Sequence, residues 1–389
     1  MPDDPTGLPD APSPSPSASA PPRPRAALIA RQALAALAVP LLAVFTALVV
    51  GAAIIALAGR DPLLAYEGLW DGCCGGARAL SDTLVWATPY VYTGLAVALA
   101  FHAGLFNIGA EGQLALGALV AAWLGYALPG LVGPLPGVIH LPLALLGGAL
   151  AGAAWGALPG WLKARTGAHE VINTIMLNYV ALLAVSYLLN GPLRDPNPLN
   201  VIARTPEIAA SARLPRLAPD LRLHAGVLLA LAMTGAAWWG LYHTPLGFAI
   251  RAVGANPAAA RVAGMPVGGL LVAALALSGA LAGLGGAVEV TGLHYRQELG
   301  FSLGYGFDAI AIALLARAHP LGVVPAALLL GALRSGAARM QFLAGVPVDL
   351  VLVLEGLILL FVAAEVLVRR LYRLPAAGPP LVFTRGWGA

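Results

Sequence analysis

The sequence predicts an all-α polytopic membrane protein with about ten transmembrane helices, some of them short or discontinuous. Of the 389 residues, 59% are hydrophobic and only 10% are charged, whereas a soluble domain has about 25% charged residues. The apolar residues form long runs, and about 20 predominantly apolar residues suffice for one crossing. Glycine is abundant, with 47 residues, which favours close helix contacts in lipid.

The two ends of the chain differ from the apolar middle. Residues 1–25 are rich in Pro, Ser and Ala, a composition typical of a disordered tail. The first apolar run is longer than the hydrophobic region of a cleavable signal peptide, so we expect an uncleaved first span. Residues 26–368 form the predicted transmembrane domain, and residues 369–389 form a basic tail.

Ten apolar segments divide the predicted transmembrane domain. They are residues 33–58, 84–100, 109–128, 138–162, 171–189, 225–241, 267–290, 305–316, 321–333 and 348–368. Residues 59–83 are expected to form a polar loop, and residues 190–224 form the longest loop. Segments 305–316 and 321–333 are each short for a full crossing, so they are either two tight spans or a re-entrant pair of partial helices.

The distribution of basic residues orients this bundle. Ten crossings put both chain ends and the connections 163–169 and 243–266 on one side. That side carries Arg23, Arg25, Arg31, Lys163, Arg165, Arg251, Arg261, Arg317 and four arginines of the C-terminal tail. The other side carries Arg60, Arg78, Arg296, Arg334, Arg339 and the five arginines of loop 190–224. The positive-inside rule makes the first side cytoplasmic, so we expect both termini there and loop 190–224 outside.

One predicted span carries a regular row of glycines. Gly148, Gly152, Gly156 and Gly160 recur every four residues in segment 138–162, which places them on one helix face. Small residues in such a row let the backbone of a neighbouring helix approach closely. We therefore interpret the row as a packing surface.

The sequence lacks the motifs of several enzyme classes. The only lysine, Lys163, follows Leu162, whereas a phosphate-binding loop needs glycine before its lysine. The seven histidines are scattered and the two cysteines, Cys73 and Cys74, are adjacent, so neither residue type has metal-ligand spacing. We expect no metal, no cofactor and no nucleic-acid partner for this chain.

A polar stripe runs along the fifth predicted span. Glu170, Asn173, Thr174 and Asn178 follow at i, i+3, i+4 and i+8, which is one face of a helix. Polar groups are costly inside a membrane, so the stripe faces either a cavity or other helices. Both a solute path and helix packing satisfy this pattern.

A second polar cluster, Asn107, Glu111 and Gln113, lies where the third predicted span begins. The free backbone N–H groups and the dipole of a helix start favour a carboxylate there. Glu111 is therefore either a helix cap or a functional group. Glu289, Asp308 and Glu355 lie in later spans, where few cationic residues are expected nearby. Such carboxylates suit hydrogen bonds to a neutral solute or proton carriage.

Residues 243–266 interrupt the apolar pattern and predict a short helix outside the membrane. Asn256 suits the N-cap, Pro257 the first helical position and Gly264 a left-handed position after the helix end. Pro266 stops any continuation. A helix this short does not fold alone, so we expect it to dock on a surface.

Five segments together carry a family resemblance. They read GLFNIGAEGQ at 104–113, EVINTIMLNY at 170–179, GFAIRAVGANP at 247–257, SGALAG at 278–283 and GYGFDAIA at 304–311. With these segments in order over residues 84–368, the chain resembles the inner-membrane permease subunits of ABC importers. The resemblance is to the nucleoside branch, which is related to ribose and galactose permeases. It implies a type II importer-like permease fold.

The resemblance also implies an assembly. Its parts are two permease subunits, identical or paralogous, two cytoplasmic ATPases that bind ATP and Mg²⁺, and an external solute-binding protein. A cytoplasmic helix with an Ala-Ala-x-x-x-Gly core docks into the ATPase in such permeases. The matching helix here consists of Asn256, Pro257, Ala259, Ala260, Arg261 and Gly264. Two departures are Ala258, where glutamate is typical, and Ala316 with Arg317, where a glycine is expected.

We therefore expect an inner-membrane permease for a nucleoside of the purine class, and not an enzyme. The residues expected to line its path are Asn107, Glu111, Gln113, Glu170, Asn173, Thr174, Asn178 and Asp308, with Tyr179 or Phe307 for stacking. A simple-sugar permease has the same machinery and is the main alternative. A proton-coupled secondary transporter would use Glu111, Asp308 or Glu355 as carriers. An intramembrane enzyme lacks a nucleophile–base pair at suitable spacing.

Overall fold

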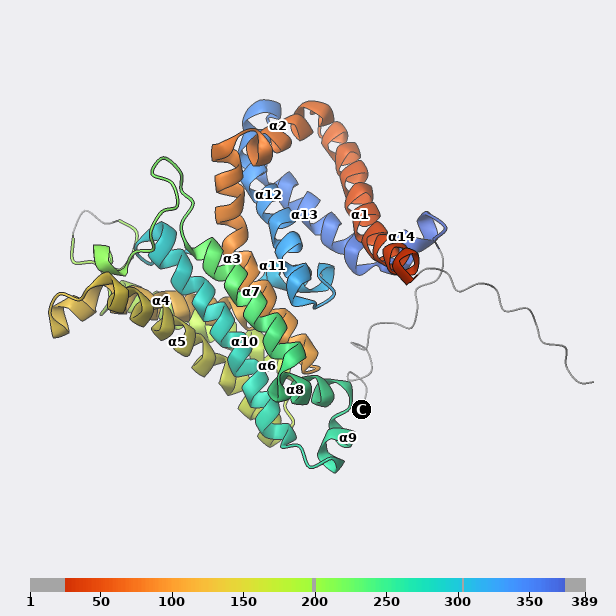
Figure 1. Cartoon of the computed structure of the whole chain (residues 1–389). Helices are drawn as coiled ribbons and strands as arrows, with labels where there is room; N and C mark the ends of the chain where they lie inside the picture. The colour runs from red at the N-terminus through yellow and green to blue at the C-terminus, as the bar shows by residue number, and fades with distance from the viewer. Residues whose placement is uncertain (1–24, 198–200, 303, 375–389) are drawn as a thin grey trace, which may run out of the picture.

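The structure is a computed structural model that describes residues 25–197, 201–302 and 304–374. Helices and connecting loops make up the described part, and no β-strand forms in it beyond two isolated bridges. Most of the predicted tails, at 1–24 and 375–389, lie outside the described residues. Figure 1 shows α3, α4, α5, α6, α7 and α10 together in one bundle, and α1, α2, α12 and α13 beside this bundle.

Helices cover the ten predicted spans, and one of them, α11, is short. They are α1 (Arg25–Leu57), α3 (Ala77–His102), α4 (Ala110–Val132), α5 (Gly137–Thr166), α6 (Glu170–Asn190), α7 (Gly226–His243), α10 (Val267–Glu289), α11 (Tyr305–Leu315), α12 (Pro320–Ala344) and α13 (Val348–Ala363). Six of the described helices, namely α3, α4, α5, α6, α10 with its extension, and α12, are long and apolar enough to cross a membrane. This confirms an all-α polytopic membrane protein, and the count of ten crossings stays a prediction.

Short helices connect these spans. They are α2 (Pro62–Cys74), η1 (Ala210–Ala212), α8 (Pro245–Ala255), α9 (Pro257–Val262), the π-helix η2 (Val290–His294) and α14 (Glu365–Leu371). The expected polar loop at 59–83 is wrong, because α2 and the start of α3 occupy it. Asp61 caps α2, accepting a hydrogen bond from the Leu63 N–H at 2.8 Å, and Pro62 takes the first helical position.

The pair α11 and α12 differs from both sequence-based alternatives. The eleven residues of α11 extend about 16 Å, which is half of a bilayer. The predicted segment 321–333 is too short, because α12 runs on for 25 residues to Ala344, about 37 Å. One partial helix therefore precedes one full-length helix, and Arg334 lies inside α12 rather than in an outer connection.

The predicted glycine row packs against α10. A methyl group added at Gly152 would lie 2.8 Å from the Cα of Gly283, and one at Gly156 would lie 3.1 Å from the Cα of Gly279. Gly117 of α4 contacts Gly283 as well. The backbones of α4, α5 and α10 therefore touch without intervening side chains, and we call these three helices the glycine-packed unit.

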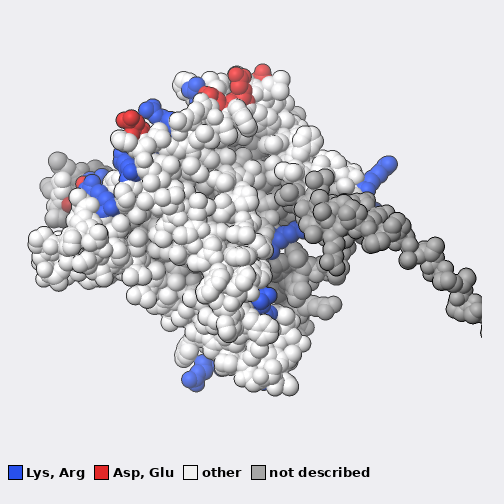
Figure 2. Space-filling view, viewed as in Figure 1, with Lys and Arg blue, Asp and Glu red and all other residues white. Residues whose placement is uncertain are grey.

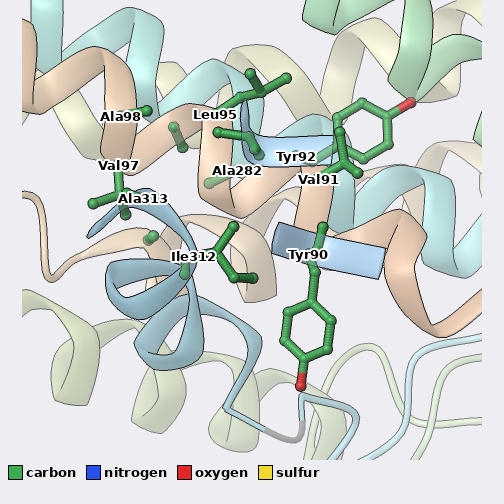
Figure 3. Close-up of a cluster of buried hydrophobic side chains, with 14 of the residues drawn as sticks. Tyr90, Val91, Tyr92, Leu95, Val97, Ala98, Ala282, Ile312 and Ala313 are labelled. Atoms are coloured by element: carbon green, nitrogen blue, oxygen red, sulfur yellow. The ribbon is translucent and has the colours of Figure 1, made fainter. Parts of the chain in front are cut away.

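Helix α3 forms the centre of the molecule. Of its most apolar window, 89% is buried, because α3 lies between α10 and α11. Figure 3 shows Ala282 of α10 on one side of it and Ile312 and Ala313 of α11 on another. Tyr90 and Tyr92 of α3 point in different directions, so one helix supplies a hydroxyl group to each flank.

The two ends of the bundle carry different charge. Figure 2 shows acidic and basic side chains together at the end with α2, and only basic ones at the end with α8 and α9. The described basic residues at the second end include Arg165, Arg261 and Arg317. This asymmetry follows the distribution from which the sequence-based orientation was argued.

Candidate functional site

Two helices, α4 and α11, begin next to each other inside the bundle. Glu111, in the first turn of α4, is only 3% exposed. Its carboxylate accepts a hydrogen bond from the Gly306 N–H of α11 at 2.6 Å and another from the Ser302 hydroxyl. We call Glu111, Ser302 and Gly306 the Glu111 junction. One carboxylate therefore stabilises the positive ends of two helix dipoles.

Gly306 is required at this junction by contact distance. A methyl group there would lie 2.7 Å from the carbonyl carbon of Ala110, at the start of α4. The backbones of the two helix starts therefore touch, and a larger residue would separate them. The carboxylate thus joins two separate elements rather than capping only its own helix, and a functional role for Glu111 stays a prediction.

The amide cluster beside the junction is fully hydrogen-bonded. Asn107 donates to Gln113 Oε1 at 2.9 Å and to Ser278 Oγ at 2.8 Å, and Ser278 donates to the Ala96 carbonyl at 2.6 Å. Ser278 lies midway along α10, so the chain turns back into the bundle before α4 begins. Asn107 and Gln113 thus link α3, α4 and α10.

The polar stripe of α6 also meets protein partners. Asn178 accepts from the Gly112 N–H at 2.8 Å and donates to the Ile108 carbonyl at 2.6 Å. Thr174 is buried and donates to the Glu170 carbonyl at 2.8 Å. The Glu170 carboxylate lies 2.5 Å from Lys163 Nζ. These contacts match the packing interpretation and support the start of α4 from outside.

The remaining predicted path residues are dispersed. Asn173 is half-buried, and its Nδ2 has no hydrogen-bond partner among the described residues. Tyr179 is 60% exposed on α6 and Phe307 is 45% exposed on α11, so the two predicted stacking rings lie on different helices. The structure brings most of the polar set together around the start of α4, and its contact with a solute stays a prediction.

Asp308 belongs to a cluster of charges that sequence reasoning missed. Arg334 Nη2 of α12 lies 3.0 Å from Asp308 Oδ2 and 3.3 Å from Glu355 Oε2 of α13. Tyr90 donates to Asp308 at 2.8 Å and accepts from Arg334 Nε at 3.1 Å. The expectation of few cationic partners is therefore wrong for both carboxylates. It failed because α12 was predicted to end at residue 333, one residue before this arginine.

A small pocket lies directly beyond the Glu111 junction. Its volume is about 80 Å³, and its lining includes Trp86, Glu289, His294, Phe301 and Tyr305. Sequence reasoning singled out only Glu289, and the nearest signal for the rest was a tryptophan within a predicted span. Nearby, burial lowers the pKa of the His224 imidazole, whose Nδ1 accepts from the Gly226 N–H at 3.2 Å.

The short helix α9 forms as the sequence predicts. Asn256 accepts from the Ala259 N–H at 3.0 Å, Pro257 occupies the first position, and Gly264 has φ of 80°. Ala260 is buried against Val253 and α10, whereas the Ala259 and Arg261 side chains face outward. The docking of α9 on an ATPase stays a prediction.

The turn between α11 and α12 is left-handed without glycine. Arg317 and Ala318 have φ of 51° and 54°, values that non-glycine residues rarely adopt. The Ala318 N–H donates to the Ala313 carbonyl at 2.7 Å, and the Ala318 carbonyl lies 3.1 Å from His102 Nε2. The conformation for which a glycine was expected is therefore present, and it is held by contacts to α3.

One hydrolase-like pattern occurs in the sequence, Gly-x-Ser-x-Gly from Gly300 to Gly304 around Ser302. In serine hydrolases this pattern follows a strand and leads to a histidine partner. Here the Ser302 hydroxyl donates to Glu111, and no strand forms in the described residues before it. Ser302 is therefore part of the junction.

Comparison with known proteins agrees with this architecture. The chain is 42% identical over 334 residues to the guanosine ABC transporter permease protein of Bacillus subtilis, covering 86% of this chain and 94% of the relative. It is 37% identical over 348 residues to the glucose ABC transporter permease protein of Haloferax volcanii, covering 87% and 90%. A nucleoside ABC transporter permease protein of Lactococcus lactis is 34% identical over 339 residues, covering 85% and 91%.

No solved structure matches the chain. A family model described as the permease component of the branched-chain amino acid transport system matches residues 79–363. This range runs from the start of α3 to the end of α13 and holds every helix of the junction and the charge cluster. The chain therefore belongs to this family of membrane permease components, which are transport subunits rather than enzymes.

Proposed function

We propose that this chain is the permease subunit of an ABC importer for nucleosides of the purine class. The observation that carries the proposal is the 42% identity to a guanosine permease along nearly the whole of both chains. The nucleoside permease of Lactococcus lactis, 34% identical, supports the same solute class.

The proposed assembly places the chain in the inner membrane with both termini cytoplasmic. A second permease subunit, two ATPases that bind ATP and Mg²⁺, and an external solute-binding protein complete the importer. The basic end of the bundle supports a cytoplasmic position for residues 243–266, and loop 190–224 then lies outside. The chain itself carries no cofactor and binds no nucleic acid.

In the proposed cycle, α9 transmits the movement of the ATPases to the transmembrane helices. Closure of the ATPases on ATP displaces α9, with Ala259 and Arg261 at the contact and Gly264 setting the turn into α10. The displacement moves helices as rigid bodies around a central path, as in other transporters with broken helices. Glu111 lies where these helices meet in the proposed path, because its carboxylate joins the start of α4 to the start of α11.

Reconstitution into vesicles tests the proposal. The vesicles contain both permease subunits and both ATPases, and the cognate solute-binding protein is added. They should take up labelled guanosine only when ATP is present on the side of the membrane that carries the ATPases. Uptake that follows a proton gradient in vesicles with no ATPase would contradict the importer. That result would instead favour proton carriage by the buried carboxylates.

A second candidate solute is a simple sugar. The glucose permease of Haloferax volcanii is 37% identical over a similar length. Binding by the cognate solute-binding protein separates the two candidates. Retention of guanosine and inosine supports a nucleoside, whereas retention of glucose or ribose with no nucleoside bound would give the sugar assignment.

A further inference from the structure

The pocket beyond the Glu111 junction combines aromatic rings with an unsatisfied carboxylate. Trp86 and Tyr305 line it with ring centroids 6.4 Å apart, tilted by 52°, and Phe301 supplies a third ring. The Glu289 side chain is 1% exposed, and its Oε2 accepts no hydrogen bond from the described residues. His294 Nε2 lies 3.4 Å away. This pair is an ion pair only when the His294 imidazole is protonated. A buried carboxylate oxygen without a hydrogen bond is costly, so Glu289 Oε2 is available to a further donor.

The pocket wall is shaped by an unusual helix end. Helix α10 ends in the π-helix η2, whose Val290 carbonyl accepts from the Tyr295 N–H at 2.8 Å. Single π-turns are rare in proteins, and those that occur are often found at functional sites. Tyr295 has φ of 58°, and the Arg213 guanidinium lies 4.6 Å from its ring centroid. Arg213 of the loop at 201–224 therefore contacts Tyr295 in a left-handed backbone conformation, which a non-glycine residue disfavours.

The position of the pocket connects it to the proposed path. Tyr305, which lines the pocket, is the first residue of α11 and directly precedes Gly306 of the Glu111 junction. Glu289 ends α10 on the side away from α9. A solute in this pocket would thus contact Tyr305, the residue next to the contact between α4 and α11. The pocket lies at the end of α10 opposite to α9.

We infer that this pocket is the first permease site for the solute, where the aromatic rings contact a purine base and Glu289 accepts hydrogen bonds from the base N–H groups. This inference rests on the proposed nucleoside import. Bases stack on aromatic side chains, and a carboxylate accepts from neighbouring N–H donors such as those of guanine.

The size of the pocket determines how the solute enters. Sites for whole small molecules measure about 300–1,000 Å³, whereas this pocket has about 80 Å³. Part of the solute therefore fits before the path opens, so the base enters first and the ribose stays towards the solute-binding protein.

Uptake by substituted transporters tests the inference. In the reconstituted importer, Trp86→Leu and Glu289→Gln should each lower guanosine uptake about tenfold, as expected for one lost base contact. Trp86→Phe retains a ring and should retain most uptake. Trp123→Leu on the outer face of α4 and Glu67→Gln on α2, both exposed, are the matched controls and should transport normally.

Photolabelling tests the site without any substitution. In the intact importer, 8-azidoguanosine should label peptides that contain Trp86 or residues 289–305, and excess guanosine should remove the label. Label found only in other peptides would overturn the inference, as would wild-type guanosine uptake by both Trp86→Leu and Glu289→Gln. An unaltered importer that takes up no nucleoside would instead overturn the proposed function on which the inference rests.

Discussion

The two flanks of the bundle are held together by different physical means. In the glycine-packed unit, α4, α5 and α10 touch backbone to backbone, as at Gly152 and Gly283. On the other flank, α11, α12 and α13 meet through the ion pairs of Arg334, and we call these three helices the charge-linked unit. Close backbone packing has one geometry, whereas an arginine can exchange between two carboxylates as helices move.

This difference assigns a role to each unit. The glycine-packed unit connects directly to α9 through α10 and suits a rigid lever. The charge-linked unit meets it at the Glu111 junction, through the hydrogen bonds of the Glu111 carboxylate and one backbone contact at Gly306. We therefore expect motion between the units, at the starts of α4 and α11, rather than within the glycine-packed unit.

The largest effect is expected from removing the cation of the charge-linked unit. Arg334→Met leaves the buried Glu355 carboxylate without its cation and the partly buried Asp308 with only the Tyr90 hydroxyl, at a cost of about 3–5 kcal/mol of folding free energy. Thermal unfolding in detergent should detect this loss. Adding Asp308→Asn and Glu355→Gln to Arg334→Met should restore stability but not uptake. An Arg334→Met variant that is as stable as the unaltered protein would contradict the role of the ion pairs.

A smaller loss of stability is expected from a larger residue in the glycine-packed unit. Gly283→Leu would place its Cβ 2.9 Å from the Cα of Gly152 and force α5 away from α10, costing about 1–3 kcal/mol. Gly269→Leu on the same helix is the control, because its Cβ meets open space. Equal melting temperatures for the two variants would show that the backbone contact is unimportant.

The smallest effect on stability, with a large effect on transport, is expected at α9. Gly264→Val places a branched residue at φ of 80° and should shift α9, uncoupling ATP hydrolysis from uptake while membrane insertion is preserved. Gly59→Val is matched to it, because Gly59 has φ of 74° and open space around it but lies between α1 and α2. Normal uptake by Gly264→Val, or the same loss in Gly59→Val, would contradict the coupling role.

Much of the fold was predictable because it depends on local sequence. Long apolar runs define the spans, caps such as Asn256 define the short helix, and the glycine row defines the tightest packing face. Helix α2 was missed because its 13 residues carry Glu67, Asp71 and exposed polar positions, which lower its hydropathy without weakening its cap. The lesson is that local patterns locate helices well and underestimate those at the membrane surface.

The candidate site was predictable only in part, because its key contacts join distant segments. Glu111 was recognised at a helix start, but its bond to Gly306 spans 195 positions. Arg334 meets Asp308 and Tyr90 across 26 and 244 positions. A single sequence carries no signal for such pairings, so the charge cluster and the aromatic pocket became visible only in three dimensions.

Spin-label distances test most directly whether the charge-linked unit moves against a rigid glycine-packed unit. With Cys73 and Cys74 replaced by serine, labels at exposed Leu150 of α5 and Leu277 of α10 report within the glycine-packed unit, and labels at Leu150 and exposed Leu321 of α12 report across the units. When the ATPases are trapped with nucleotide, the first distance should stay constant and the second should change. A change within the glycine-packed unit, or none across the units, would contradict the account.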